Sequence, residues 1–155
     1  MIADVAVRFA RRADAAGIAA MSRDYIEVGL PWTWTQGRVA RTIQDAETNV
    51  VVVGEPRAIV AFGIMSYPDE DAHLLLLAVR PASQRQGIGS AVLQWLETVA
   101  RTAGAKRVRV EARRENVVAR SFYCEHGYHE RMIGKGLYNR IEDGVRLEKW
   151  LRSDA

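Results

Sequence analysis

The clearest hydrophobic pattern in the chain is a continuous apolar run followed by a helical repeat. Residues 74–79 are all apolar, which is typical of a central strand buried on both faces of a sheet. After residue 87, apolar residues recur at the three- and four-residue spacing of one helix face: Ile88, Ala91, Val92, Trp95, Leu96 and Val99. The pattern therefore predicts a buried strand that leads through a loop into a helix, which Gly104 ends.

Alternating and helical patterns cover the rest of the chain. Further strands are expected at residues 4–10, 49–54, 58–67, 106–111, 128–133 and 145–151. Further helices are expected from about Ala13 to Val28, from Thr35 to Ala46 and from Asn116 to Gly127. The order β-α-α-β-β-β-α-β-α-β-β predicts an α/β (α+β) fold. In this fold a mixed, mostly antiparallel sheet of six to seven strands carries helices on both faces.

The loop between the apolar run and the helix contains Gln84-x-x-Gly87-x-Gly89. Backbone N–H groups at a helix start lack partners and carry positive partial charge, and glycine lets a ligand approach them closely. The loop therefore predicts a phosphate cradle made mostly of main chain. The spacing excludes a Walker loop. The dinucleotide fingerprint fits less well because Val92 holds its third glycine position, although Glu111 lies where its ribose carboxylate is expected.

A second motif follows at residues 116–128: Asn116-x-x-Ala119-x-x-Phe122-Tyr123-x-x-x-Gly127-Tyr128. Together the two motifs resemble the coenzyme A pyrophosphate loop and a later segment of the GNAT N-acetyltransferase superfamily. The resemblance covers roughly residues 50–130 by motif. It implies a single acetyltransferase domain over residues 1–155, with acetyl-CoA as the co-substrate and an amine as the usual acceptor.

The resemblance gives several positions a cofactor role. In the family, main-chain groups near Leu77 and Val79 pair with the pantetheine arm, and an N–H near Leu77 faces the thioester oxygen. Amides of residues 85–90 bind the pyrophosphate, and the Gln84 side chain braces the loop. Asn116 matches a residue that contacts the pantetheine arm, and it also suits a helix N-cap. The implied cofactor-binding set is Leu77, Val79, Gln84, Arg85, Gln86, Gly87, Ile88, Gly89, Ser90, Asn116 and Tyr123.

Two residues match the acid and base positions of the family. Tyr123 matches the family's usual general acid. A phenol suits that role because it stays protonated at neutral pH and can protonate a leaving thiolate. An ordinary buried aromatic is the alternative. His73 lies eleven residues before Gln84, where some family members place a glutamate or histidine base. Glu70, Asp71 or a chain of waters could serve instead, and no metal site is expected.

The acceptor side carries a weaker signal. Tyr25, Trp32 and Trp34 lie near the loop that joins the first two helices, which borders the acceptor site in the family. An aromatic wall there would select an apolar or aromatic acceptor, and packing of a short loop is the alternative. The glycine-containing loop expected at residues 134–144, which includes Tyr138, Asn139 and Arg140, would form a second acceptor wall or the edge of a homodimer.

Composition narrows the class of protein further. The 155 residues suit one domain, and no apolar segment reaches the length of a membrane span. The single cysteine, Cys124, excludes an internal disulfide and suggests a packing thiol in a cytoplasmic protein. The net charge is +3, from 22 basic and 19 acidic residues. A basic stretch would either attract a CoA 3′-phosphate or an anionic acceptor, or form a solvated face: Lys106, Arg107, Arg109, Arg113, Arg114 and Arg120.

The residues and the resemblance together favour an acetyl-CoA-dependent N-acetyltransferase. The acceptor would be a small-molecule or peptide amine, and no membrane or nucleic-acid partner is indicated, because no nucleic-acid motif is present. One alternative is a module that senses acyl-CoA without turnover, against which the presence of Tyr123 argues. Another is a modifier of protein or aminoacyl-tRNA that uses the same chemistry.

Overall fold

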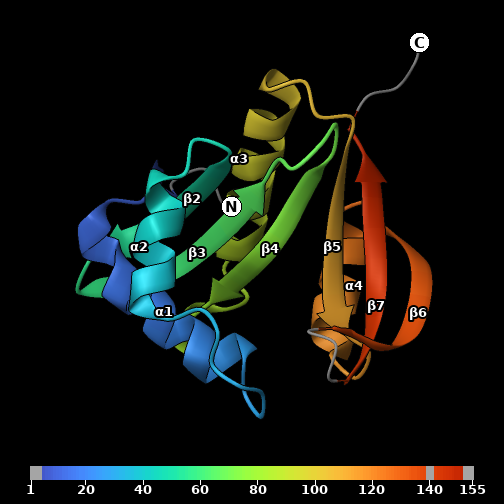
Figure 1. Cartoon of the computed structure of the whole chain (residues 1–155), viewed down its shortest axis with the longest axis horizontal. Coiled ribbons are helices and arrows are strands. Elements are labelled where there is room, and N and C mark those ends of the chain that lie inside the picture. The colour runs from blue at the N-terminus through green and yellow to red at the C-terminus, as the bar shows by residue number, and fades with distance from the viewer. Residues whose placement is uncertain (1–4, 139–141, 152–155) are drawn as a thin grey trace.

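The computed structural model describes the backbone of residues 5–138 and 142–151, and the side chains of residues 5–131 and 144–151. Figure 1 shows the chain as a sheet with helices on both sides. In chain order the elements are β1 (Val7–Phe9), α1 (Ala15–Met21), α2 (Gln36–Gln44), β2 (Thr48–Glu55), β3 (Ala58–Ser66), β4 (Ala72–Val79), α3 (Ile88–Thr102), β5 (Arg107–Arg113), α4 (Val117–Glu125), β6 (His129–Tyr138) and β7 (Glu142–Trp150).

The seven strands form one sheet in the order β1-β2-β3-β4-β5-β7-β6. Neighbouring strands are antiparallel except β4 and β5, which run parallel because the connection through α3 returns the chain to the same edge. The predicted element order and the predicted mixed, mostly antiparallel sheet are both confirmed. The middle of this sheet, where the parallel pair lies, is also where the two sequence motifs meet.

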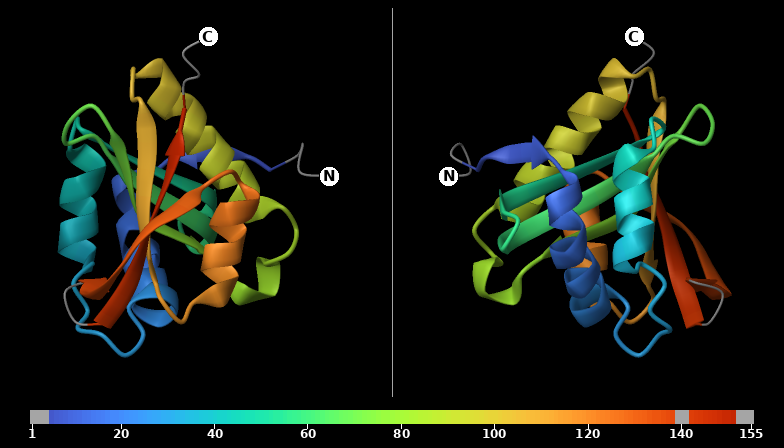
Figure 2. Two further views of the ribbon diagram at one scale, coloured as in Figure 1. Left: turned by 90° about the vertical axis from the view of Figure 1, so that its right-hand side faces the viewer. Right: turned by 60° about the vertical axis from the view of Figure 1, so that its left-hand side comes forward.

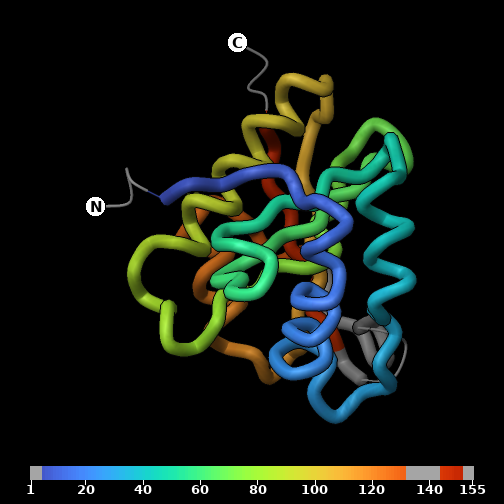
Figure 3. The backbone as a smooth tube through the Cα atoms, turned by 90° about the vertical axis from the view of Figure 1, so that its left-hand side faces the viewer, coloured from blue at the N-terminus to red at the C-terminus, as the bar shows by residue number. Residues whose placement is uncertain are grey.

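Two apolar clusters fill the two faces of the sheet. One packs α3 against β3 and β4 through Val92, Leu93 and Leu96, all fully buried. The other places Ile18 of α1 and Val39 of α2 against the opposite face. Figures 2 and 3 show α1 and α2 side by side on that face, with α3 and α4 on the other. The predicted arrangement of helices on both faces is therefore confirmed.

The parallel pair β4–β5 is short, and this opens the sheet. The two strands are in register only over Ala72–Leu74 and Val108–Val110, after which they diverge (Figure 1). On its other edge β4 has a bulge, because Leu76 lies opposite Ile64 while Leu74 lies opposite Met65. Past Leu74, the main-chain edge of β4 that faces β5 thus has no strand partner among the described residues.

The prediction that residues 74–79 are buried on both faces is wrong at Leu75. Its side chain is 42% exposed, whereas Leu74 and Leu76 are buried. Leu75 is the extra residue of the bulge, so Leu74 joins the cluster on one face of the sheet and Leu76 joins the cluster on the other. The apolar run therefore marks a strand that borders an opening, rather than one that is covered on both sides along its whole length.

The predicted first helix is interrupted. A 3-10 turn over Arg12–Asp14 precedes α1, and a π turn over Ser22–Ile26 follows it, in which the N–H of Glu27 donates to the Ser22 carbonyl at 2.7 Å. A π turn adds one residue to the helical repeat. Tyr25 and Val28, which lie near the end of the predicted helix, are 39% and 55% exposed.

Two further expectations need correction. The loop expected at residues 134–144 is largely strand, because β6 continues to Tyr138 and β7 begins at Glu142, and Gly134 pairs with Gly144. Asn139 and Arg140, expected there as part of an acceptor wall, lie outside the described residues. Cys124 is exposed, so the interpretation as a packing thiol is wrong. Among the residues that the structure describes, no helix has both the length and the apolar character that crossing a membrane requires.

Candidate active site

A cleft of about 750 Å³ lies between the diverging ends of β4 and β5, on the face of the sheet that carries α3 and α4. We call it the glycine-loop cleft. Nine of the eleven residues that the sequence assigns to cofactor binding line it: Leu77, Val79, Gln84, Arg85, Gly87, Gly89, Ser90, Asn116 and Tyr123. The other two do not line it, because Gln86 is exposed and Ile88 packs against the apolar core.

The loop that enters α3 has the backbone geometry of an anion-binding cradle. Arg85 and Gly87 both have left-handed backbone angles, with φ values of 65° and 78°. This conformation is strained for arginine, and left-handed residues of this kind occur in anion-binding nests. No side chain caps the first turn of α3. The Gln84 side chain donates to the carbonyl of Val79 at 3.0 Å, which fastens the loop to the end of β4.

The opposite wall of the cleft comes from α4. The Asn116 side-chain oxygen accepts from the N–H of Ala119 at 3.1 Å, so the residue caps the helix and also lines the cleft. Tyr123 is 6% exposed, and its ring meets those of Phe122 and Tyr128 edge to face at centroid distances of 5.3 and 5.6 Å. These contacts hold the phenol of Tyr123 in one orientation beside the cleft.

A hydrogen bond that the sequence did not reveal joins α3 to α4. In His126, Nδ1 lies 2.7 Å from the carbonyl oxygen of Phe122, and Nε2 lies 2.8 Å from Oγ of Ser90. Because a carbonyl only accepts, Nδ1 carries the proton, and the neutral ring accepts the Ser90 hydroxyl proton at Nε2. Ser90, in the first turn of α3, is thereby fixed by a residue of the second sequence motif.

A second cavity, of about 380 Å³, adjoins the first. We call it the polar pocket. Its floor is formed by side chains of the central strands, namely His73 of β4, Arg109 and Glu111 of β5, and Arg146 of β7. Its wall comes from the segment around α2 and consists of Glu27, Trp34 and Arg38. The alternation along β5 explains the floor, because Val108, Val110 and Ala112 are buried in the core and the charged residues between them face the other way.

Six residues line both cavities: Ile26, Leu74, Leu75, Leu76, Val110 and Glu111. Among them Glu111 alone is ionisable, and it accepts a hydrogen bond from Arg146 at 3.2 Å. The sequence suggests only one role for Glu111, that of the ribose carboxylate of a dinucleotide site. The alternating charges of residues 107–113 indicate a strand with one polar face, but they do not reveal that this face borders two cavities.

Glu27 organises the wall of the polar pocket although it is 3% exposed. Its carboxylate accepts from the N–H and the hydroxyl of Thr33 at 2.6 and 2.7 Å, from the hydroxyl of Ser22 at 2.8 Å and from the N–H of Trp34 at 3.3 Å. Burial acts to raise the pKa of Glu27, but these hydrogen bonds outweigh it and hold the pKa below its ordinary value. The ionised carboxylate therefore fixes the segment between α1 and α2.

The predicted acceptor residues divide between the cavities. Tyr25 lines the glycine-loop cleft, and Trp34 lines the polar pocket with the Arg38 guanidinium 3.7 Å from its ring centroid. Trp32 lines neither cavity and is 42% exposed beside Arg23. The structure thus brings two of the three aromatic residues to the opening between β4 and β5.

The residues that the sequence suggested as general bases lie in different surroundings. His73 lines the polar pocket, and its Nε2 is buried without a hydrogen-bond partner. Glu70 pairs with Lys106 at 3.3 Å, and Asp71 accepts from Arg107 at 3.0 Å, and neither carboxylate lines a cavity. Of the bases that the sequence suggested, His73 is therefore the one that faces the opening.

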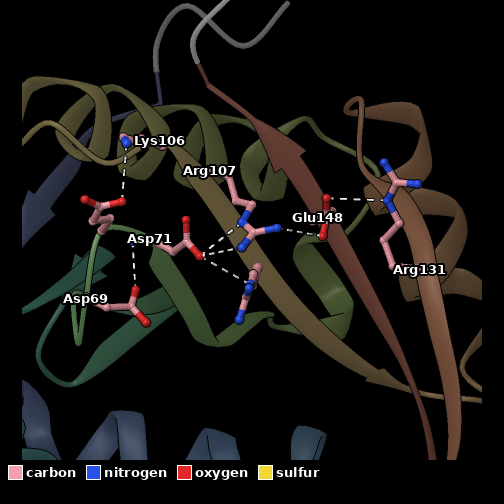
Figure 4. Close-up of polar contacts among 8 residues, drawn as sticks. Asp69, Asp71, Lys106, Arg107, Arg131 and Glu148 are labelled. Carbon is pink, nitrogen blue, oxygen red and sulfur yellow. Dashed lines mark hydrogen bonds and ion pairs between the residues drawn. The ribbon is translucent and has the colours of Figure 1, made fainter.

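Most of the predicted basic stretch is engaged in ion pairs. Figure 4 shows Arg107 between Asp71 and Glu148, and Glu148 also pairs with Arg131 at 3.4 Å. Arg120 binds Glu130 at 2.7 Å. Arg113 lines the glycine-loop cleft, where its guanidinium donates to the carbonyl of Ile26 at 2.7 Å. The stretch therefore acts in large part as a structural network across β4, β5 and β7.

Comparisons with known proteins agree with this architecture. Residues 19–128 match the family described as the acetyltransferase (GNAT) family. The [ribosomal protein bS18]-alanine N-acetyltransferase of Haemophilus ducreyi is 30% identical over 113 residues, which are 73% of this chain and 77% of that protein. An uncharacterized N-acetyltransferase of Methanocaldococcus jannaschii is 34% identical over 80 residues, which are 51% of this chain and 51% of that protein. The chain therefore spans about half the length of this relative.

Solved structures show the same fold. The ribosomal-protein-S18-alanine N-acetyltransferase from Escherichia coli superposes with a TM-score of 0.80 at 20% identity, over 97% of this chain and 96% of that chain. The PaiA N-acetyltransferase from Thermoplasma acidophilum, solved in complex with coenzyme A, gives a TM-score of 0.77 at 19% identity, over 95% of this chain and 99% of that chain. At these identities the likeness establishes the fold alone.

Proposed function

Because the chain belongs to the GNAT acetyltransferase family, we propose that it transfers an acetyl group from acetyl-CoA to a primary amine by direct attack. The observation that carries the proposal is the meeting of two differently built cavities at the opening between β4 and β5. One includes the uncapped start of α3 and the unpaired edge of β4 and suits a phosphorylated cofactor, and the other is lined by charged side chains and suits an amine. The thioester would lie where they share residues.

The glycine-loop cleft fits the chemical groups of coenzyme A. Open N–H groups at the start of α3, with the left-handed Arg85 and Gly87 before it, suit a pyrophosphate. The unpaired edge of β4 past Leu74 offers main-chain donors and acceptors to the amides of a pantetheine arm. We assign the pyrophosphate to the main chain of residues 85–90, and the arm to Leu77 and Val79 with Asn116 opposite them.

The proposed reaction forms a C–N bond and breaks a C–S bond. The neutral amine attacks the thioester carbon, the acetyl group moves to nitrogen, and the coenzyme leaves as a thiolate. Tyr123 is the proposed acid, because a phenol with an ordinary pKa of about 10 remains protonated at neutral pH and can protonate that thiolate. Its burial and its two ring contacts support this role by holding the phenol at the cleft.

The base is proposed from the residues around the polar pocket. Glu111 lines both cavities, whereas His73 lines the polar pocket alone. We therefore propose that Glu111 takes the proton from the acceptor ammonium, with His73 as the alternative. The acidic limb of the kcat/KM profile tests the assignment, because that limb reports protonation of the essential base in the free enzyme. Glu111→Gln and His73→Ala should be compared, and the variant that removes this limb identifies the base.

The acceptor class rests on the relatives. The Haemophilus ducreyi relative is a [ribosomal protein bS18]-alanine N-acetyltransferase, and the Escherichia coli protein of similar structure is a ribosomal-protein-S18-alanine N-acetyltransferase. A peptide or protein amino terminus is therefore one proposed acceptor, and a small amine that fits a pocket of about 380 Å³ is the other. A sensor that binds acyl-CoA without turnover is disfavoured, because a sensor has no use for an acid such as Tyr123 at the cleft.

Thiol release from acetyl-CoA tests the proposed function. Purified protein should be given acetyl-CoA with a panel of small amines, free amino acids and short peptides that begin with alanine, and the acetylated product should be identified by mass spectrometry. Amine-dependent thiol release with a matching product is the expected result. Acetyl-CoA binding without thiol release from any amine would favour the sensor instead.

A further inference from the structure

The polar pocket holds cationic side chains that its own carboxylates do not neutralise. We propose that it binds an amine acceptor that also bears an anionic group close to the amine, with the free carboxylate of an amino acid as the favoured source. The inference rests on the proposed function and adds the chemical class of the acceptor.

The carboxylates of the pocket are already occupied. Both oxygens of Glu27 accept hydrogen bonds, from Thr33 to one and from Ser22 and Trp34 to the other. Glu111 accepts from Arg146 at 3.2 Å, so one cation of the pocket is paired within it. Glu27 is therefore not available to a charged group of the acceptor, whereas Glu111, with its one hydrogen bond from Arg146, lines both cavities and can still meet the amine.

Two guanidinium groups are less completely paired. Arg38 stacks on Trp34 at 3.7 Å, and it makes no ion pair with a carboxylate of the described part of the chain. Arg109 is paired with Asp71 through its buried Nε at 3.4 Å, although that N–H makes no hydrogen bond. Asp71 also accepts a hydrogen bond from Arg107, which lies between Asp71 and Glu148, so Arg109 shares this carboxylate with a second guanidinium (Figure 4).

Because Arg109 shares Asp71 with Arg107, its charge is only partly balanced, and a bound anion would balance it further. His73 adds to this arrangement, because it lies opposite Arg109 in the β4–β5 register and its Nε2 also lacks a partner. Planar guanidinium groups bind carboxylates with paired hydrogen bonds, so Arg38 and Arg109 are suited to hold one. Arg38, His73 and Arg109 all line this pocket, so an anion bound there would meet one guanidinium without an ion pair and one that shares its carboxylate.

The distance between Arg109 and Glu111 limits how far apart the amine and the anionic group of the acceptor can be. Arg109 and Glu111 stand two residues apart on the same face of β5, which corresponds to about 6.6 Å along a strand. An acceptor whose amine approaches Glu111 while its anion approaches Arg109 can therefore have only a few bonds between the two groups. A free amino acid has that geometry. A peptide amino terminus has it only when an acidic side chain follows closely.

Matched acceptors test the inference directly. Methionine, phenylalanine and glutamate should each be compared with their carboxamides, which lack the negative charge of the α-carboxylate. Because the carboxamide also lowers the pKa of the amine, the rates should be compared per neutral amine across a range of pH. A second arm compares Ala-Asp-Gly-amide with Ala-Asn-Gly-amide, which separates an acidic peptide from a free amino acid. We expect kcat/KM, measured by thiol release, to be at least about tenfold higher for free amino acids than for their amides. This is the size of effect expected when one charge-assisted contact is lost.

Other results of this panel overturn the inference. Amides acetylated as fast as the acids would overturn it while leaving thiol release, and hence the proposed function, intact. A preference confined to the acidic peptide would assign the anion to a side chain and reject the free amino acid. If no acceptor of either arm is acetylated although acetyl-CoA raises Tm, the inference fails. If acetyl-CoA neither binds nor reacts, the proposed function itself fails.

Variants of Arg38 provide a second test. In Arg38→Gln we expect KM for the free amino acid to rise about tenfold, with KM for the amide and the Tm increase given by acetyl-CoA unchanged. Arg38→Lys keeps the charge and should recover part of the loss. Arg41→Gln, an exposed position on the same helix outside both cavities, is the matched control and should behave as wild type. An equal effect of Arg38→Gln on acid and amide would contradict anion binding.

Discussion

The glycine-loop cleft and the polar pocket meet at one opening but are built from different chemical groups. The cleft takes its binding groups mainly from main chain, in the loop before α3 and along the unpaired edge of β4. The pocket takes its groups from charged side chains on three strands and on the segment around α2. A main-chain site tolerates many side chains provided that the backbone keeps its path, whereas a side-chain site changes with each substitution.

This difference separates the two halves of the proposed reaction. The cleft would bind the coenzyme, which is the substrate that family members share. The pocket would choose the acceptor, through groups such as Arg38, Arg109 and Glu27 that a few mutations could replace. Substitutions in one cavity should therefore change one binding step and leave the other nearly unchanged, apart from those residues that stand where the two cavities meet.

The largest effect is expected at the acid that stands beside the opening. Tyr123→Phe should lower kcat by about 10²-fold, because general acid catalysis typically contributes 10²- to 10⁴-fold. The apolar contacts of the ring are kept, so acetyl-CoA affinity should change little. Steady-state thiol release together with a binding titration measures both quantities. Phe122→Leu, which alters a neighbouring ring without removing a hydroxyl, is the control, and unchanged turnover in Tyr123→Phe would remove this residue from the mechanism.

The next largest effect is expected in the cleft. Gly87 has a φ of 78°, a conformation that a β-branched residue adopts only at considerable cost. Gly87→Val should therefore reshape the cradle and raise the Kd for acetyl-CoA at least about tenfold, while the ratio of rates for acid and amide acceptors stays as in wild type. Gly104→Val is the matched control. Gly104 has a φ of 92° at the far end of α3 with open space around it, so its variant shares the backbone strain but not the cradle.

A smaller effect on stability is expected where the wall of the polar pocket is fixed. Glu27→Gln places an amide N–H₂ against donors that need an acceptor, which should lower the free energy of unfolding by about 1–3 kcal/mol at pH 7. It should also weaken acceptor binding without changing acetyl-CoA affinity. Chemical denaturation of the wild type, the variant and the exposed control Asp24→Asn measures the difference.

The same contribution has a defined pH dependence. The pKa of Glu27 is lower in the folded protein than its ordinary value of about 4.3, so the folded state binds the proton less readily than the unfolded state. The stabilisation is therefore complete above that ordinary value and is lost as the pH falls below it through the lowered pKa. The difference between wild type and Glu27→Gln should shrink over that acidic range. A difference that grows there would contradict the assignment.

The smallest effect is expected at the link between α3 and α4. His126→Leu removes the acceptor for the Ser90 hydroxyl and should raise the Kd for acetyl-CoA about threefold, as expected for one neutral hydrogen bond. Acceptor discrimination should not change. His129→Leu, an exposed histidine on β6, is the control. An equal change in both variants would show that the hydrogen bond between Ser90 and His126 does not support the cradle.

The sequence was most informative where a structure depends on neighbouring residues. The strand, loop and helix of residues 74–102 follow from an apolar run, two glycines and a helical repeat, and Thr35 and Asn116 cap their helices as their positions suggested. The cleft is built largely from these continuous segments. Its residues could therefore be named from two motifs, with Gln86 and Ile88 as the ones that face elsewhere.

The polar pocket could not be predicted because its residues meet only after folding. Glu27, His73, Glu111 and Arg146 come from four separate stretches of the chain, and no local pattern relates them. Two irregular backbone segments escaped prediction for the same reason, because each depends on contacts that form only on folding. The π turn after α1 depends on the buried contact between Ser22 and Glu27, and the bulge at Leu75 depends on pairing with β3. Both moved side chains away from the positions that regular helical or strand repeats predict.

Thermal unfolding with acetyl-CoA, CoA and NADH added separately tests the central claim most directly. At about 100 times its Kd, a ligand that binds only the folded state adds roughly 2.7 kcal/mol of stability, or on the order of 5–10 °C in Tm for a chain of this size. We expect such a shift with acetyl-CoA and CoA, none with NADH, a clearly smaller shift in Gly87→Val at the same ligand concentration, and an unchanged shift in Arg38→Gln. No shift with acetyl-CoA, or a shift with NADH instead, would contradict the assignment of the glycine-loop cleft to coenzyme A.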